Sequence, residues 1–319
     1  MLAAVTPQSL LQQQVSSLQN HTAAVLDGGV EGVHAARIAT RRIRELLPLT
    51  GEWHRPDVVD SLHQRFRAVG RALGKVRDAD VRILLLKQLE PRIPSAVPAL
   101  VGVRQHQERR RLELMRKLIK QFEHDGLPEL MHEALRGRRV SSAWRRSGRP
   151  WRRQLQSILS ERAQSATDAV RHATGVYFPH RAHSARIAIK KLRYALEIAE
   201  ATSTLRTTEA IPDLKEAQDI LGDLHDRQEL VDELADAMPL SDVARTVDQM
   251  GLVTHVVEAD IHDLHARYLS RRNRVLTVAD GARHLKDDRR VGTPLMIAAG
   301  ALVVSSGLVV AQSSWHRRV

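Results

Sequence analysis

The sequence predicts an all-α fold made of two copies of one helical bundle. Across the 319 residues, Val, Ile and Leu recur at spacings of three and four, and the alternation typical of strands is absent. Hydrophobic residues make up 43% of the chain but aromatic residues only 3%, so the interior must be built from Leu, Val, Ile and Ala, as in helix bundles. Two sequence motifs also recur about half a chain apart.

Residues that break helices divide the chain into helical runs of roughly 15 to 35 residues. The breaks fall at 27–29, 48–56, 91–98, 125–128, 175–179 and Pro239. Around 138–150 the chain is polar, basic and interrupted by Gly and Pro, so we expect a linker there. The first helical bundle is then predicted over residues 1–137 and the second over residues 151–280.

An internal repeat supports this division. Residues 33–47 align with residues 182–196, and seven of the fifteen positions are identical. Residues 73–81 align in the same way with residues 221–229, at nearly the same offset. Two matched pairs at one offset indicate a duplicated bundle rather than chance similarity.

The first motif places its cations on one face of a helix. At 100° per residue, four basic side chains fall within a stripe about 80° wide and the apolar residues fall on the opposite side. These stripes, called the basic ridges below, hold His34, Arg37, Arg41 and Arg44 in the first copy, and His183, Arg186, Lys190 and Arg193 in the second. Arg42 and Lys191 flank them. A solvated face usually mixes charges, because like charges one turn apart repel by a few tenths of a kcal/mol. The repeated stripe therefore favours a bound anion over a merely solvated surface.

The overall charge agrees with an acidic partner. Lys and Arg total 49 against 37 acidic residues, for a net charge of +12. Arginine binds phosphate through a planar fork and stays ionised, so its dominance fits a phosphate ligand. The chain has no cysteine, which excludes disulfides, thiolate chemistry and Cys-based zinc sites. The first residues do not form a secretory signal, so we expect the bundles in the cytoplasm.

Together the motifs resemble the CHAD family, the conserved histidine α-helical domain. Its pattern is a His-x-x-Arg-x-x-x-(Arg/Lys)-(Arg/Lys)-x-Arg helix, present twice, with a Leu-Gly-x-x-Arg-Asp-x-Asp segment after each copy. The resemblance covers about residues 8 to 275. It implies two pseudo-symmetric four-helix bundles and non-enzymatic binding of inorganic polyphosphate in a basic groove. The residues expected to bind it are His34, Arg37, Arg41, Arg42, Arg44, Arg77, His183, Arg186, Lys190, Lys191, Arg193 and His225.

The second copy departs from the pattern: His225 stands where Arg is usual, and Gln228 where the second Asp is expected. We expect Asp78 and Asp226 to orient nearby cations rather than touch the anion. A ridge histidine could also gain a proton against phosphate, so binding should strengthen as pH falls through about 6.5. Polyphosphate granules are one place where such binding would act.

Other functions are less favoured. Nucleic acid is the alternative partner, but the ridges contain no Asn, Gln or Ser to read bases and only Tyr194 nearby to stack on one. No phosphate-binding loop, zinc-protease motif or nucleophile elbow is present, so we expect no enzymatic activity and no cofactor. His255, His262 and His265 share one helix, but without a fourth ligand we interpret them as solvated or core-edge residues and expect no metal.

A further helix is predicted at the C-terminal end. Residues 291–315 carry no charge, and 294–311 form an apolar stretch near the minimum length that crosses a bilayer. The basic residues upstream outnumber those downstream, which would keep the bundles on the cytoplasmic side of the cell membrane. We therefore expect a membrane anchor here, with a helix docked on the bundles or an amphipathic tail as the alternatives.

Overall fold

The structure, a computed structural model, describes residues 5–137, 150–202, 210–237 and 244–283. Within these ranges the chain is helical and contains no strand, which confirms the predicted fold class. The helices of the first half are α1 (Pro7–Leu26), α2 (Val30–Leu46), α3 (Pro56–Leu89), α4 (Val97–His124) and α5 (Leu127–Leu135). Those of the second half are α7 (Pro150–His172), α8 (Pro179–Ala201), α9 (Ala210–Ala237) and α10 (Ala244–Arg283). The predicted linker falls mainly on residues 138–149, outside the described residues.

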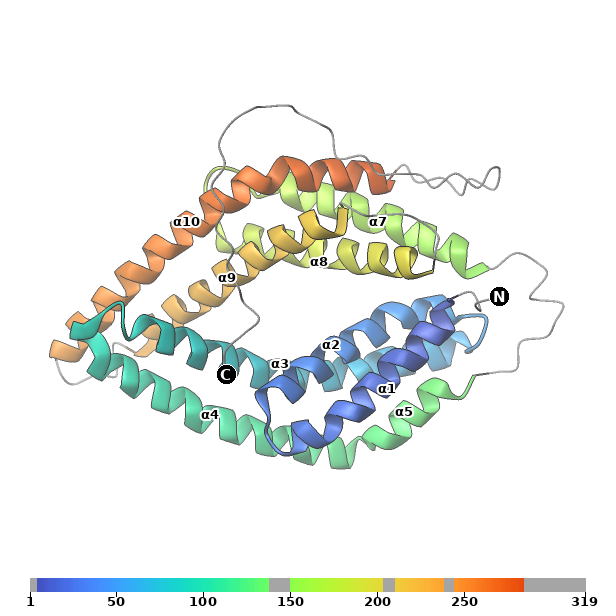
Figure 1. The fold of residues 1–319 in the computed structure, drawn as a ribbon, viewed down its shortest axis with the longest axis horizontal. Helices are drawn as coiled ribbons and strands as arrows, with labels where there is room; N and C mark the ends of the chain where they lie inside the picture. The colour runs from blue at the N-terminus through green and yellow to red at the C-terminus, as the bar shows by residue number, and fades with distance from the viewer. Residues whose placement is uncertain (1–4, 138–149, 203–209, 238–243, 284–319) are drawn as a thin grey trace.

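The two halves have the same arrangement of helices. In the second half, α7 packs on α8, α8 on α9, α9 on α10, and α10 returns to α7 (Figure 1). In the first half, α1, α2, α3 and α4 pack in the same order, and α5 returns to α1. The pair α4 and α5 therefore corresponds to the single helix α10. The two pseudo-symmetric four-helix bundles are confirmed.

Local sequence explains where the helices begin and end. Thr6 and Ser9 form a capping box at the start of α1, with the Ser9 amide donating to the Thr6 hydroxyl at 3.2 Å. Gly126 separates α4 from α5 with a φ of 59°, a left-handed conformation that favours glycine. Gly28 has a φ of 76° in the turn between α1 and α2. Proline occupies the first turn of α1, α3 and α8, where its missing amide costs nothing.

The core is built mainly from Leu, Val, Ile and Ala, and it continues through both halves. Phe66 of α3 and Tyr268 of α10 are the largest fully buried side chains, one in each half. Because each helix buries one stripe, the opposite faces of α2 and α8 are left for charged residues. The fold thus provides two rigid helices that carry the basic ridges.

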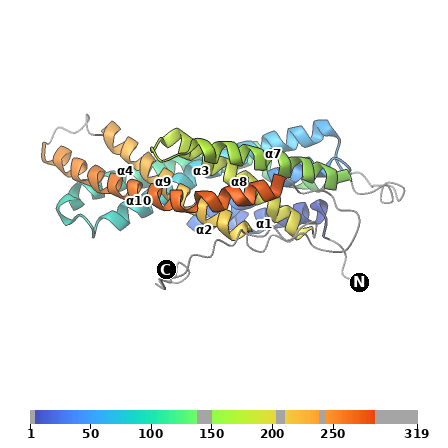
Figure 2. The same cartoon turned by 90° about the horizontal axis from the view of Figure 1, so that it is seen from above.

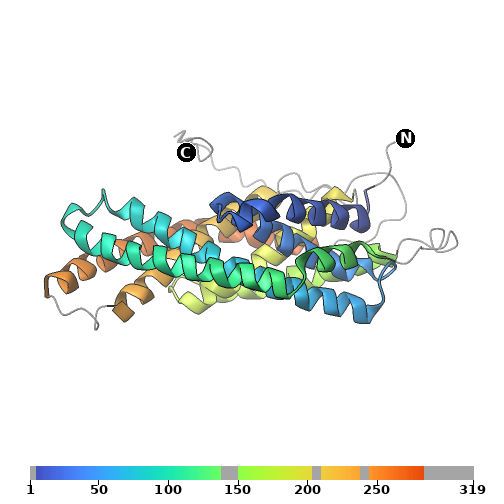
Figure 3. The same cartoon turned by 90° about the horizontal axis from the view of Figure 1, so that it is seen from below.

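The halves meet through their inner helices. In Figure 1, α2 and α3 of the first half face α8 and α9 of the second, while α4 and α5, and α7 and α10, lie on the outer sides. Seen from above, the outer helices α7 and α10 lie in front (Figure 2), and seen from below, the outer helices α4 and α5 do (Figure 3). Ion pairs join the halves: Arg82 of α3 contacts Glu229 and Glu233 of α9 at 3.1 and 3.3 Å. Farther along, the Arg92 guanidinium donates twice to Asp260 of α10, at 2.7 and 2.8 Å.

The predicted membrane anchor requires a correction. None of the helices between residues 5 and 283 that the structure describes combines the length and the apolar character needed to cross a membrane. The segment on which the expectation depended, residues 291–315, lies outside the described residues. The structure therefore gives no support for a membrane partner or for a location at the inner face of the cell membrane.

Candidate functional site

The two basic ridges converge at the interface between the halves. Arg37 and Arg41 on α2, and Arg186 and Lys190 on α8, are all only partly exposed. Contact across the interface is direct, since Nη1 of Arg41 donates to the Tyr194 hydroxyl of α8 at 3.3 Å. The ridges are thus not two separate solvated faces, because each copy of the repeat contributes cations to one shared site.

A cavity of about 210 Å³ lies at this meeting point. It is called the central cavity below, and α2, α3, α8 and α9 all contribute to its wall. The lining residues are Arg37, Asp78, Val81, Arg82, Arg186, Gly222, His225, Asp226 and Glu229. Side chains of both signs line it, so its capacity for an anion depends on how the carboxylates are engaged.

The glycine of each Leu-Gly motif makes room for this arrangement. A Cβ atom at Gly74 would lie 3.6 Å from Nε of Arg37, so the arginine side chain extends across the bare backbone of α3. At Gly222, the equivalent position of α9, a Cβ atom would meet nothing within 4 Å, and the residue opens into the central cavity. The motif glycine therefore provides space beside the ridge.

Two of the three carboxylates in the cavity wall face ridge cations. Asp78 lies 3.6 Å from the guanidinium of Arg37. Burial raises the pKa of Asp226 to about 6, although the positive charge of Arg186 opposes this. Glu229 is held by Arg82. Asp78 and Asp226 thus face the ridge cations Arg37 and Arg186, which were among the cations that they were expected to orient.

The remaining cations are crowded together. Burial, and then the charges of Arg41 and Arg186, lower the pKa of Lys190 to about 7. Burial is also the main reason why the pKa values of Arg37 and Arg186 lie below the usual value, with Asp78 and Asp226 acting in the opposite direction. Arg37, Arg41, Arg186 and Lys190 therefore form a group of partly desolvated positive charges in and beside the cavity.

The histidines at the site have lowered pKa values. Burial, and then Arg186 and His183, lower the pKa of His225 to about 4. The pKa values of His34 and His183 are also lowered, mainly by burial and then by Arg77 and Arg186 respectively. The rings of His183 and His225 lie 4.7 Å apart. The ligand-free protein therefore favours the neutral form of all three histidines, the form that would donate a neutral N–H group to phosphate.

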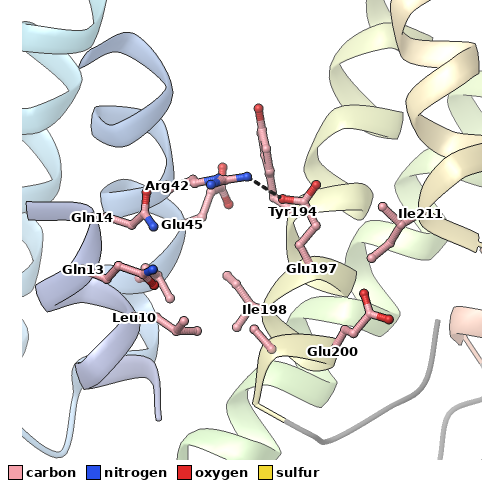
Figure 4. A pocket seen from close by; sticks show the side chains of 12 residues that line it. Leu10, Gln13, Gln14, Arg42, Glu45, Tyr194, Glu197, Ile198, Glu200 and Ile211 are labelled. Atoms are coloured by element: carbon pink, nitrogen blue, oxygen red, sulfur yellow. Dashed lines mark ion pairs between the residues drawn. The ribbon is translucent and has the colours of Figure 1, made fainter. Parts of the chain in front are cut away.

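Several predicted site residues point away from the central cavity. Arg42 is exposed and pairs with Glu197 of α8 at 3.5 Å, beside a separate cavity of about 390 Å³ (Figure 4). Arg193 donates to Glu197 and, at 3.1 Å, to Gln218, and its guanidinium lies 4.5 Å from the Tyr194 ring. Lys191 is exposed, and only its backbone carbonyl makes a contact that crosses to α7.

The other predicted residues that do not line the cavity are His34, Arg41, Arg44, Arg77, His183 and Lys190. Arg77 of α3 is near enough to His34 to lower the pKa of that histidine. Arg44 lies farther along α2, where its Nη1 is 3.9 Å from the Cβ position of Gly70 on α3.

The sequence reasoning missed residues on α3. Arg82 lines the cavity and bridges to α9, and Arg67 and Arg71 lie close to Arg44. The spacing of Arg67 and Arg71, one turn apart, was the available signal. Asp80, the last acid of the motif, has a structural role, because it is buried and pairs with Arg111 of α4.

The clustered histidines of α10 do not form a site. His265 is buried, with its ring 5.3 Å from that of Tyr177, whereas His255 and His262 are exposed. Throughout the described ranges, no three His, Asp or Glu side chains converge in a way that would hold a metal ion. The placement agrees with their interpretation as core-edge and solvated residues.

Comparison with known proteins identifies the family. The model of the CHAD domain matches residues 9–235. A solved structure described as PptA from Streptomyces chartreusis is 16% identical, with a TM-score of 0.61, and the match covers 83% of this chain and 97% of that one. The CHAD domain of the plant Ricinus communis is 21% identical, with a TM-score of 0.56 and coverage of 90% and 95%. No curated protein matches. Since the family model spans well over half of the sequence, the chain belongs to the CHAD domain family.

Proposed function

We propose that the central cavity, together with the ridge cations Arg41 and Lys190 beside it, binds inorganic polyphosphate. The observation that carries the proposal is the convergence of Arg37, Arg41, Arg186 and Lys190 from the two copies of the repeat on one partly buried site. Bringing these cations together costs free energy in the empty protein, because burial and mutual repulsion both oppose it. A chain of phosphates would neutralise them and accept several charge-assisted hydrogen bonds at once.

The chemistry of the site suits a uniform polyanion. Guanidinium groups on rigid helices can follow a flexible chain with little loss of side-chain freedom. The neutral rings of His183 and His225 can each donate an N–H group to a phosphate oxygen. Nucleic acid fits less well, because Tyr194 is only 5% exposed and lies against Arg41 and Arg193, so a base cannot stack on it.

The proposal includes binding without catalysis. Asp78 lies beside Arg37, and Asp226 faces the charge of Arg186. These carboxylates therefore serve to hold guanidinium groups in place rather than to activate water. Incubating the protein with long-chain polyphosphate and Mg²⁺ should leave the chain length unchanged on a gel, and progressive shortening would contradict this part of the proposal.

A titration tests the binding itself. Wild-type protein is titrated with long-chain polyphosphate at about 50 and 200 mM salt, where a ligand with six or more phosphate contacts should lose about 10³ in affinity. The variant with Arg37, Arg41, Arg186 and Lys190 changed to Ala should bind at least about tenfold more weakly.

A matched variant removes four exposed cations of α4, namely Arg109, Arg110, Arg116 and Lys117. It loses the same net charge away from the cavity, so it should retain most of the affinity. Equal losses in the two variants would mean that net charge alone attracts the ligand. Displacement of polyphosphate by duplex DNA at equal phosphate concentration would favour a nucleic-acid function instead.

A further inference from the structure

The two copies of the repeat treat one equivalent arginine differently. Arg193 of α8 is held by Glu197 and Gln218 and packs on the Tyr194 ring. Arg44 occupies the same repeat position on α2, yet its Nε is buried without a hydrogen-bond partner. Across the described residues, Arg44 makes no hydrogen bond or ion pair with any side chain. One arginine is thus satisfied inside the protein and the other is not.

The neighbours on the adjacent helix explain the difference. Gln218 of α9, which accepts from Arg193, is replaced in the first copy by Gly70 of α3. One residue later, an acid in α9, Asp219, is replaced by a base in α3, Arg71. Arg67, one turn earlier on α3, adds a further cation. Since Arg67 corresponds to Lys215 of α9, both copies have a cation there. The copies differ one turn later, where Gln218 and Asp219 of the second copy are replaced by Gly70 and Arg71.

These three guanidinium groups are close enough to interact. Burial lowers the pKa of Arg44, and the charges of Arg67 and Arg71 lower it further. The nearest acid, Glu45, is already paired with Arg162 of α7. Arg67 and Arg71 are both exposed, so a ligand can reach them from solvent. The arrangement offers several forked donors, with an unsatisfied buried N–H among them, to an anion rich in acceptors.

The position along α2 relates this cluster to the central cavity. Arg44 follows Arg37 by seven residues, or about 10 Å along a helix that rises 1.5 Å per residue. Arg41 lies between them and faces the same way. A polyanion that leaves the central cavity along α2 would therefore reach Arg44 next. The equivalent arginine of α8 differs, because Arg193 pairs with Glu197 and lies near Asp219.

We propose that Arg44, Arg67 and Arg71 form a second phosphate-binding site, called the outer site. Only a polyphosphate chain long enough to extend beyond the central cavity can occupy both sites. Arg193 then has a structural role, so the ligand extends over the first bundle and not over the second. This inference rests on the proposed function, because it assigns a direction and a minimum length to the same ligand.

The test compares two ligand lengths. In the variant Arg67→Ala with Arg71→Ala, long-chain polyphosphate should bind about tenfold more weakly. The slope of log affinity against log salt should also fall by about 1 to 1.5, as expected for two lost phosphate contacts. Tripolyphosphate, which has only three phosphates, should bind this variant as tightly as it binds wild type. The matched control changes Arg153 and Arg171, two exposed cations of α7, to Ala and should alter neither ligand's affinity.

The outcomes separate this proposal from the broader one. Suppose that wild type binds long-chain polyphosphate and that the Arg37, Arg41, Arg186 and Lys190 variant binds it more weakly. If the Arg67 and Arg71 double variant then binds as its α7 control does, the outer site is refuted and the proposed function stands. Equal weakening of the long chain and of tripolyphosphate also refutes it. Absence of binding by wild type overturns both proposals. Arg193→Gln supplies an independent measurement: it should lower the melting temperature and leave the affinity for the long chain within about twofold.

Discussion

Lys190 should make polyphosphate binding depend on pH. Burial and the charges of Arg41, Arg186 and Arg37 lower its pKa to about 7, and only Glu45 acts appreciably in the opposite direction. A phosphate chain beside the ammonium group would raise the pKa again. Above pH 7 the complex then holds one more proton than the free protein does, so affinity must fall as pH rises.

The magnitude follows from the two pKa values. If the bound lysine stays protonated, the association constant is divided by a factor of 1 + 10^(pH − 7). This factor grows by at most about 30-fold between about pH 6 and pH 8.5. Because Lys190 is partly exposed, solvent screening reduces the effect, and we expect a change on the order of tenfold.

Titrations at constant ionic strength between about pH 6.5 and 8.5 measure this effect. The lower limit stays above the titration of Asp226, whose pKa is about 6, and of terminal phosphates, whose pKa is also about 6. Lys190→Arg is the control, because its guanidinium stays charged, so its affinity should change little over the range. If this variant and wild type show the same pH profile, Lys190 is not the group that titrates.

Lys190 should also make the stability of the ligand-free protein depend on pH, with stability rising where affinity falls. The pKa of Lys190 is lower in the folded than in the unfolded chain, where it is near 10.5, so the unfolded chain holds more protons between pH 7 and that value. Stability without ligand should therefore rise with pH over this range. Lys190→Met should raise the melting temperature at pH 7 by roughly 2–4 °C, corresponding to about 1 kcal/mol, while weakening binding. A lower melting temperature would contradict the inferred burial of charge.

Three further changes test the fold around the site. Gly222→Ala should stabilise α9 by about 0.5–1 kcal/mol in urea unfolding, because its Cβ meets nothing within 4 Å, whereas Gly222→Leu should fill the central cavity and weaken polyphosphate binding in the titration. Asp260→Ala removes the double hydrogen bond to Arg92 between the halves and should cost about 1 kcal/mol, with a non-additive effect when combined with Arg92→Ala. Phe66→Ala, at a fully buried position, should cost about 3–5 kcal/mol, and a loss below about 1 kcal/mol would contradict the close packing of this side chain in the core.

The duplicated fold was predictable because its signals are local and repeated. The spacing of apolar residues determines which face of each helix is buried, and the recurrence of the motif at one offset indicates two equivalent bundles. The same geometry correctly grouped Arg37 with Arg41 and Arg186 with Lys190. Angular position on one helix does not specify which helix packs opposite, however. The pairing of Arg42 with Glu197 across the interface therefore could not be predicted.

The charge states were not predictable for a related reason. A reference pKa describes a solvated group, and the expectation for the ridge histidines used that value. The structure places His225 where burial and Arg186 oppose its protonation, while Lys190 is lowered to the range in which a histidine would ordinarily titrate. Desolvation depends on neighbours distant in sequence, so the titrating group can be identified only from the fold.

The contrast between the equivalent arginines Arg44 and Arg193 shows how the stability cost of unpaired cations is limited in a duplicated site. Arg193 could have been assigned a structural role from sequence, since Glu197 lies one turn later on the same helix. The corresponding position after Arg44 is Pro48, which cannot pair with it. Every partly buried cation that has no acidic partner lowers the stability of the ligand-free protein. The number of such cations in the two copies is therefore limited by the small net stability of the fold. One copy therefore satisfies its outer arginine internally and strengthens the interface, and the other keeps its arginine available. Symmetry of the backbone with asymmetry of charge is the arrangement expected when the ligand enters at the shared centre and leaves along one bundle.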